Sequence, residues 1–281
     1  MAETPLTRTR TAAAPVVRRA GGRPAWLLAL ASLPLLLFLL VPLIALVLRV
    51  SPTDLLGRLA DPEVAPAIWL SIWTTLCTAG MTLLAGTPLA FLLARYRFRG
   101  RTALDTLLDL PMVMPPSVAG IALLLAFGRR GMLGASLDVW GVQIAFTPLA
   151  VILAQTFVAA PFYVKSATAG FAGVDRDLEQ AAQVDGASPT QVIRLITVPL
   201  AWPALLGGLV MTWARALGEF GATIIFAGNF PGRTQTMPLA IYLGFERDLD
   251  VALSLAFILL LTSFAILLFV RFVLGQRVTL L

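Results

Sequence analysis

The chain has 281 residues, of which 58% are hydrophobic and 13% charged, and its formal net charge is +6. Soluble domains carry about 25% charged residues, so this deficit indicates a chain that lies in a lipid bilayer. The single cysteine excludes a disulfide or a thiolate metal site within one chain, and the lack of histidine removes the commonest metal ligand and general base. Nucleic-acid binding is not indicated, because the arginines are sorted by loop rather than gathered on one face.

The N-terminal segment 1–25 is a polar tail with five arginines, and an apolar run at 26–48 follows it. That run is too long for the core of a signal peptide, which spans about 7–15 residues. It matches the roughly 20 residues that a transmembrane helix needs. We therefore expect a basic tail followed by a first transmembrane helix.

Five further apolar segments are long enough to cross a bilayer. Together with 26–48 they predict an all-α membrane protein with about six transmembrane helices. The prolines from Pro111 to Pro116 predict a kink or a split in the third span. A broken helix can mark a transport path, although a packing kink gives the same pattern. The five segments are 67–94, 107–127, 146–166, 203–227 and 251–270.

The distribution of positive charge predicts the orientation. If the N-terminus is cytoplasmic, the inner segments hold 14 lysines and arginines and the outer segments hold 6. Because cytoplasmic loops carry the excess of positive charge, both termini are expected inside. The polar segment 175–199 is then cytoplasmic as well.

Segment 175–199 lies between two apolar blocks and predicts two short helices joined by a glycine. The first runs from about 177 to 185, with the aspartate at 175 or 177 as its N-cap. Gly186 stands where a helix commonly ends in a left-handed residue. Ser188 then caps a second helix, with a proline at its first position, where no backbone N–H is needed.

The spacing in this segment resembles the EAA loop of ABC importer permeases, whose pattern is E-A-A-x3-G-x9-I-x-L-P. Gln180 stands where that family usually has Glu, and Val198 where it has Leu. Glu179 points about 100° away on a helix and is not expected to replace the missing carboxylate. The resemblance implies a cytoplasmic two-helix coupling loop that docks into an ATPase subunit. The residues implied in this coupling are Leu178, Gln180, Ala181, Ala182, Asp185, Gly186, Ala187, Ile196 and Pro199.

Arg215 and Glu219 lie inside the fifth predicted span, one helical turn apart, and Thr212 and Thr223 extend the same polar stripe. Intramembrane charges are costly and usually face a bundle interior or a cavity. Two interpretations stay open. The stripe borders a translocation path, or the two charges form a structural ion pair that orients the helix.

The run ARALGEFGATIIFAGNFPGRTQTMPLAIY at 214–242 resembles the corresponding segment of molybdate permeases, and sulfate permeases have a related one. The resemblance implies a permease for an oxyanion, molybdate first, with tungstate not separable from it. The alternatives are a sulfate or thiosulfate permease, and a stand-alone channel or secondary carrier. A membrane-embedded enzyme is disfavoured, because the spans hold no paired-carboxylate motif and the chain has no histidine.

The sequence contains no Walker A motif, so we do not expect the chain to bind and hydrolyse ATP itself. The resemblance implies a permease domain at 67–271 without a cofactor or metal of its own. ATP and magnesium are then bound by partner ABC ATPase subunits. A homodimer of permeases in the cytoplasmic membrane and an extracytoplasmic oxyanion-binding protein complete the implied complex.

Overall fold

The computed structural model describes residues 25–50, 57 and 64–278, so the basic tail predicted at 1–25 falls outside it apart from Ala25. The chain divides into two compact units, 1–48 and 49–281. Helix α1 (Ala25–Arg49), which includes Pro34 and Pro42, lies in the first unit except for its last residue. Its segment 26–49 has a mean hydropathy of 2.8, which agrees with the first span predicted at 26–48.

All the regular secondary-structure elements that are described in the second unit are helical. In chain order these are α3 (Val64–Arg95), α4 (Arg101–Val113), α5 (Pro116–Phe127), α6 (Gly134–Val139), α7 (Pro148–Ala172), α8 (Arg176–Val184), α9 (Pro189–Val192), the π-helical turn η1 (Ile193–Thr197), α10 (Val198–Leu217), α11 (Gly221–Phe226), α12 (Met237–Arg247) and α13 (Leu249–Val278).

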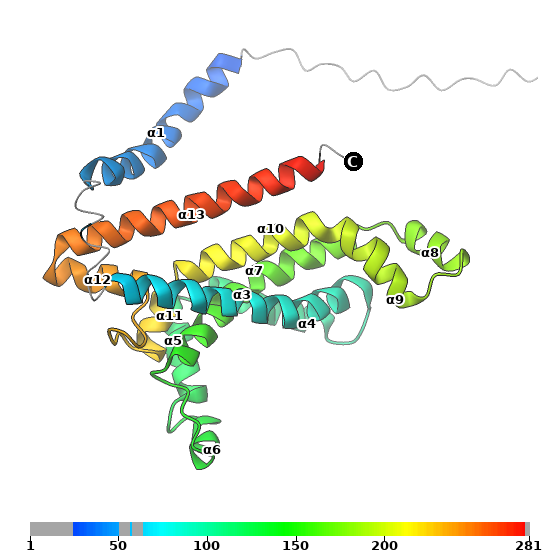
Figure 1. Ribbon diagram of the computed structural model, residues 1–281. Coiled ribbons are helices and arrows are strands. Elements are labelled where there is room, and N and C mark those ends of the chain that lie inside the picture. Colours follow the sequence, from blue (N-terminus) through cyan, green and yellow to red (C-terminus); the bar gives the residue numbers. More distant parts are fainter. Residues whose placement is uncertain (1–24, 51–56, 58–63, 279–281) are drawn as a thin grey trace, which may run out of the picture. The chain divides into compact units, whose positions relative to one another are not determined.

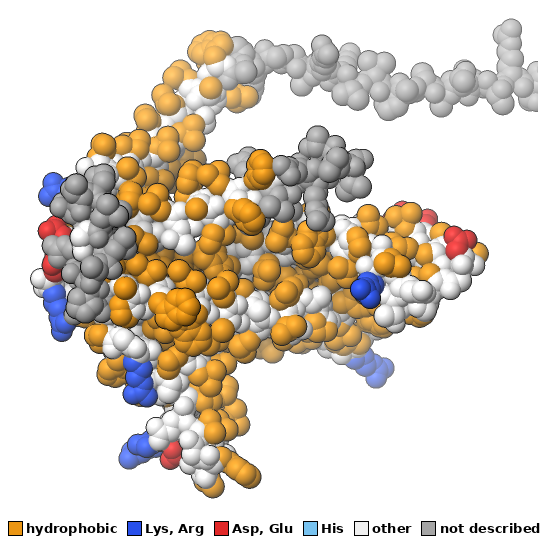
Figure 2. Space-filling view, in the orientation of Figure 1, with side chains coloured by type: hydrophobic (Ala, Val, Ile, Leu, Met, Phe, Trp, Pro, Cys, Tyr) orange, Lys and Arg blue, Asp and Glu red, His pale blue; other side chains and the backbone are white. Residues whose placement is uncertain are grey.

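The number of membrane-spanning helices agrees with the prediction. Among the described residues, five helices are long and apolar enough to cross a membrane, or six if α4 and α5 count as one span. Figure 2 shows apolar side chains over the sides of the bundle, and lysine, arginine and acidic side chains mainly at its ends and around α6. A bundle surrounded by lipid requires this arrangement, because charges are costly beside acyl chains.

Helix α7 is the centre of the second unit. In its most apolar stretch 56% of the residues are buried, against 33% for α3 and for the span that includes α10. It packs against α3, α4 and α10, which run beside it in Figure 1. Lys165 on α7 forms ion pairs of 2.8 Å with Asp105 and 2.9 Å with Asp109, so α4 is attached to α7 by charge as well as by apolar contact.

Small side chains allow α7 and α10 to approach closely. Ser166 on α7 donates a hydrogen bond of 2.7 Å to the carbonyl oxygen of Ala204 on α10. A Cβ added to Gly208 would lie only 2.7 Å from the Cβ of Ser166. Without a hydrophobic effect between helices in lipid, such close packing and interhelical hydrogen bonding are what hold the pair together.

The third predicted span is split, as the proline cluster predicts. The axes of α4 and α5 differ by 116°, with the break between Val113 and Pro116. Pro116 occupies the first turn of α5, where its missing N–H costs nothing. Helix α5 then packs against α11, and a Cβ on Gly120 would lie 2.8 Å from the carbonyl oxygen of Ala222.

The fifth span does not follow its predicted limits, 203–227. Helix α10 ends at Leu217, and α11 is a separate short helix. The carboxylate of Glu219 accepts a hydrogen bond of 2.8 Å from the backbone N–H of Ala222, so it caps the start of α11. The prediction of one helix through Ala227 was therefore wrong, because it treated a capping carboxylate as a residue within a helix.

Two adjacent glycines on α10 test the close contact with α7. We expect Gly208→Ala to lower the free energy of unfolding by about 1–3 kcal/mol, because overpacking displaces a helix. A Cβ on Gly207 meets no atom within 4 Å. Gly207→Ala should therefore raise stability by up to about 1 kcal/mol through helix propensity alone. Thermal unfolding in detergent compares the variants, and equal midpoints would contradict the contact.

Candidate functional site

The helices predicted in segment 175–199 are present with the predicted caps. Asp175 caps α8, and its side chain accepts a hydrogen bond of 3.0 Å from the N–H of Asp177. Gly186 has a φ of 92°, which only glycine adopts without strain. Ser188 caps α9 in a reciprocal arrangement with Gln191, whose side chain accepts from the Ser188 N–H at 2.7 Å. We call α8, the Gly186 turn, α9 and η1 the elbow.

The second arm of the elbow is continuous with a transmembrane helix, which the sequence did not predict. From Pro189 to Leu217, α9, η1 and α10 form one helical span of 29 residues. In η1 the N–H of Val198 bonds to the carbonyl of Ile193, as in a π-helix. This wider turn directly precedes Pro199, whose ring would crowd the carbonyl one turn earlier in a regular α-helix. The helix therefore continues through Pro199 into α10.

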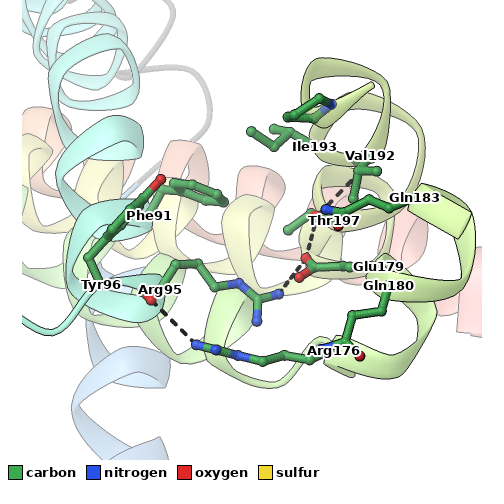
Figure 3. Close-up of a pocket in the computed structure, with 11 residues that line it drawn as sticks. Phe91, Arg95, Tyr96, Arg176, Glu179, Gln180, Gln183, Val192, Ile193 and Thr197 are labelled. Carbon is green, nitrogen blue, oxygen red and sulfur yellow. Dashed lines mark hydrogen bonds and ion pairs between the residues drawn. The ribbon is translucent and has the colours of Figure 1, made fainter. Parts of the chain in front are cut away.

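A largely buried ion pair joins the first arm of the elbow to α3, and its carboxylate also contacts η1. Arg95, the last residue of α3, donates to the Glu179 carboxylate at 2.7 Å. Thr197 in η1 donates its hydroxyl to the same carboxylate oxygen at 2.6 Å. The side chains of Arg95 and Glu179 are only 9% and 17% exposed. Figure 3 shows the two side chains pointing toward each other from α3 and α8, with Thr197 beside them.

Sequence reasoning missed this carboxylate. The spacing assigned Gln180 to the position where the family usually has Glu, and Glu179 was not expected to replace the missing carboxylate. In the structure Gln180 is exposed and lines a pocket of about 350 Å³ beside Arg95 and Glu179. The partners of Glu179 lie 84 and 18 residues away along the chain, so no local spacing could have revealed them.

The structure brings together part of the predicted coupling set. An open groove of about 400 Å³ runs along the elbow between α8 and the second arm. Of the predicted coupling residues, Leu178, Gln180, Ala181 and Pro199 lie outside this groove. The residues that line it are Ala182, Asp185, Gly186, Ala187, Gln191, Val192, Leu195 and Ile196.

The groove has the chemistry of a protein-docking surface rather than of a reaction centre. Its lining is formed by small and aliphatic side chains together with Asp185 and Gln191. A Cβ on Gly186 would meet no atom within 4 Å, so the backbone there is open to an approaching surface. No group of three or more potential metal ligands occurs among the described residues.

The polar stripe predicted in the fifth span divides at the end of α10. Arg215 and Glu219 form an ion pair of 2.8 Å, in which Glu219 is 1% exposed and the Arg215 side chain 31%. Thr212 instead donates to the carbonyl of Ala159 on α7 at 3.1 Å. Thr223 lies on α11, and its buried hydroxyl has no hydrogen-bond partner among the described residues. The two charges thus lie together at the helix break, while the two threonines belong to different packing contacts.

Comparison with known proteins identifies the family. Residues 86–279 match the model of the binding-protein-dependent transport system inner membrane component family. The chain belongs to this family: it is the membrane component of an ABC importer and is not catalytic. The resemblance to ABC importer permeases is therefore confirmed. The family works with an ATPase and a binding protein, resides in the inner membrane as a multi-pass protein, and implies no cofactor in this chain.

Similar curated proteins come from two branches. The molybdenum transport system permease protein ModB of Mycobacterium tuberculosis (strain ATCC 25618 / H37Rv) is 41% identical over 228 residues, covering 81% of this chain and 86% of its own. ModB of Escherichia coli (strain K12) is 39% identical, covering 73% of this chain and 93% of its own. The sulfate transport system permease protein CysW of the same strain is also 39% identical, covering 85% and 83%.

Solved structures share the fold. A bacterial ABC transporter involved in import of the acidic polysaccharide alginate matches with a TM-score of 0.68 and 20% identity, covering 89% of this chain and 96% of its own. The MetNI methionine ABC transporter in an inward-facing conformation matches with a TM-score of 0.60 and 17% identity, covering 76% and 95%. The all-α permease fold expected from the sequence is confirmed.

Proposed function

We propose that this permease transports an oxyanion, and that the oxyanion is molybdate, with tungstate accepted as a close chemical analogue. The 41% identity to a molybdenum permease supports this proposal, as does the run at 214–242. The similarity to a sulfate permease at 39% keeps sulfate or thiosulfate as the second candidate. The permease works as a homodimer with both termini in the cytoplasm, and an extracytoplasmic binding protein delivers the anion.

The elbow is the docking surface for the ATPase in this proposal. The observation that carries it is the shape of the elbow, a groove of small and apolar residues whose second arm continues into the membrane as α10. A partner that moves the elbow moves this span with it, because the helix is uninterrupted from Pro189 to Leu217. The ATPase supplies the nucleotide and magnesium chemistry, and this chain supplies a surface that is displaced.

The translocation path in this proposal borders the two helix breaks. Helices α5 and α11 follow the breaks after α4 and α10 and pack against each other. Interrupted helices are a common feature of transport sites in membrane proteins. Arg215 at the second break is a third exposed while its partner Glu219 is buried, so the guanidinium is the accessible member of the pair. The path thus places Arg215 within reach of a passing anion, with Glu219 holding it.

Two substitutions test docking at the elbow. We expect Gly186→Glu and Ala182→Arg to abolish uptake while the permease stays in the membrane, because a large charged side chain would enter the docking groove. Co-purification of the ATPase and uptake into vesicles are measured together. Gly141→Glu is the matched control, since Gly141 also has a positive φ (72°) and open space at its Cβ but lies in the loop after α6. Normal uptake and ATPase binding in both elbow variants would contradict docking.

Substrate identity is tested in proteoliposomes that contain the permease with its ATPase and binding-protein partners. We expect uptake of labelled molybdate that requires ATP, falls by about half with an equal concentration of tungstate, and is unaffected by a hundredfold excess of sulfate. The reason is that tungstate has the same charge, shape and size as molybdate, so the two anions share one set of contacts, whereas sulfate is a smaller tetrahedral dianion. Suppression by sulfate would favour the sulfate permease, and uptake without ATP would favour a channel or carrier.

A further inference from the structure

Helix α8 is held to the rest of the chain by polar contacts rather than by burial. None of its residues is buried. Its connection to α3 consists of the Glu179–Arg95 ion pair and a bond of 3.3 Å from the Arg176 guanidinium to the carbonyl of Arg95. Helices usually pack through the burial of an apolar face, so a surface helix without buried residues depends on the polar contacts it makes.

The Glu179 carboxylate is the point where three elements meet. One of its oxygens accepts from Arg95 at the end of α3 and from Thr197 in η1. Arg95 also donates to the carbonyl of Val174 through both terminal nitrogens at 3.4 Å, which fixes the guanidinium beside the start of α8. The carboxylate therefore links α8 at once to the C-terminal end of α3 and to the turn from which α10 continues.

Both side chains of this ion pair are mostly shielded from solvent. A guanidinium that is 9% exposed has little access to water, so it depends on the carboxylate for compensation. Thr197 is 1% exposed, and its hydroxyl has Glu179 as its shortest contact. Exposed ion pairs contribute little because water and salt screen them, whereas this pair is mostly shielded from solvent.

We propose that Glu179 is a positioning residue that transmits displacement of α8 to helices α3 and α10 together. This inference rests on the proposed docking of an ATPase at the elbow. Displacement of α8 is transmitted to α10 through Thr197 and the π-helical turn, and to α3 through Arg95. Both helices flank α7. Without the carboxylate, α8 still presents its part of the docking surface, but it loses its link to α3 through Arg95 and its link to η1 through Thr197.

The test uses the complete complex in proteoliposomes, with labelled molybdate as the probe. Glu179→Gln keeps the shape and removes the charge, and Thr197→Val removes only the hydroxyl. Asp177→Asn is the matched control, because it makes the same carboxylate-to-amide change on the same helix at an exposed position. Three quantities are measured: co-purification of the ATPase, ATP hydrolysis stimulated by the binding protein, and molybdate uptake per ATP hydrolysed.

We expect Glu179→Gln to lower uptake per ATP by about tenfold or more, since a hydrogen bond to a charged group is worth about one to two factors of ten. ATPase co-purification should stay within about twofold of the native complex, because the docking groove is unchanged. Thr197→Val should lower the same ratio by a smaller factor, and the double variant should not be worse than Glu179→Gln alone. This lack of additivity identifies one shared contact. Asp177→Asn should behave as the native complex.

Different results overturn different statements. If Glu179→Gln keeps native uptake per ATP, the positioning role is wrong while docking stands. If Glu179→Gln instead loses the ATPase, Glu179 belongs to the docking surface or to folding, and the positioning role is again wrong. Fully additive losses in the double variant would also overturn it. If even the native permease fails to bind an ATPase, the proposed function itself fails.

Discussion

The continuity of one helix is the constraint on which the rest of the structure depends. From Pro189 to Leu217 the chain forms a single span that joins the second arm of the elbow to a membrane helix. Pro199 lies within this span, and its ring lacks an N–H and would crowd the carbonyl one turn earlier in a regular α-helix. The π-helical turn η1 accommodates the proline and also places Thr197 against Glu179. One local irregularity thus makes the elbow continuous with α10 and fixes it to α8.

The ion pairs within the bundle mainly connect neighbouring helices. Lys165 joins α7 to α4, Arg95 joins α3 to the elbow, and Arg215 pairs with the carboxylate that caps α11. Charges in a bilayer are costly unless they are paired, and each of these side chains has a partner of opposite charge. Helices α7 and α10, by contrast, are held by small residues along their length.

Local signals in the sequence predicted local structure well. The number of spans, the split at Pro111–Pro116 and the caps at Asp175, Gly186 and Ser188 all follow from short patterns, and the structure confirms them. The errors arose where the role of a side chain depends on the contacts it makes in the fold. Glu219 caps the short helix after the break, and Glu179 contacts Arg95, which lies 84 residues away along the chain. Hydropathy and spacing carry no information about such pairs, so the coupling residues could be placed on the elbow but not connected to the bundle.

The account requires the elbow to face the cytoplasm, and labelling the elbow from each side of the membrane tests this most directly. Val184 on the elbow is 87% exposed, and Trp140, directly after α6, is 83% exposed. Each is replaced by cysteine in a Cys77→Ser background, and a membrane-impermeant maleimide is applied to right-side-out and inside-out vesicles. A cytoplasmic elbow predicts that the cysteine at 184 reacts only in inside-out vesicles, and the one at 140 only in right-side-out vesicles. Reaction of position 184 in right-side-out vesicles would place the elbow beyond the reach of any ATPase.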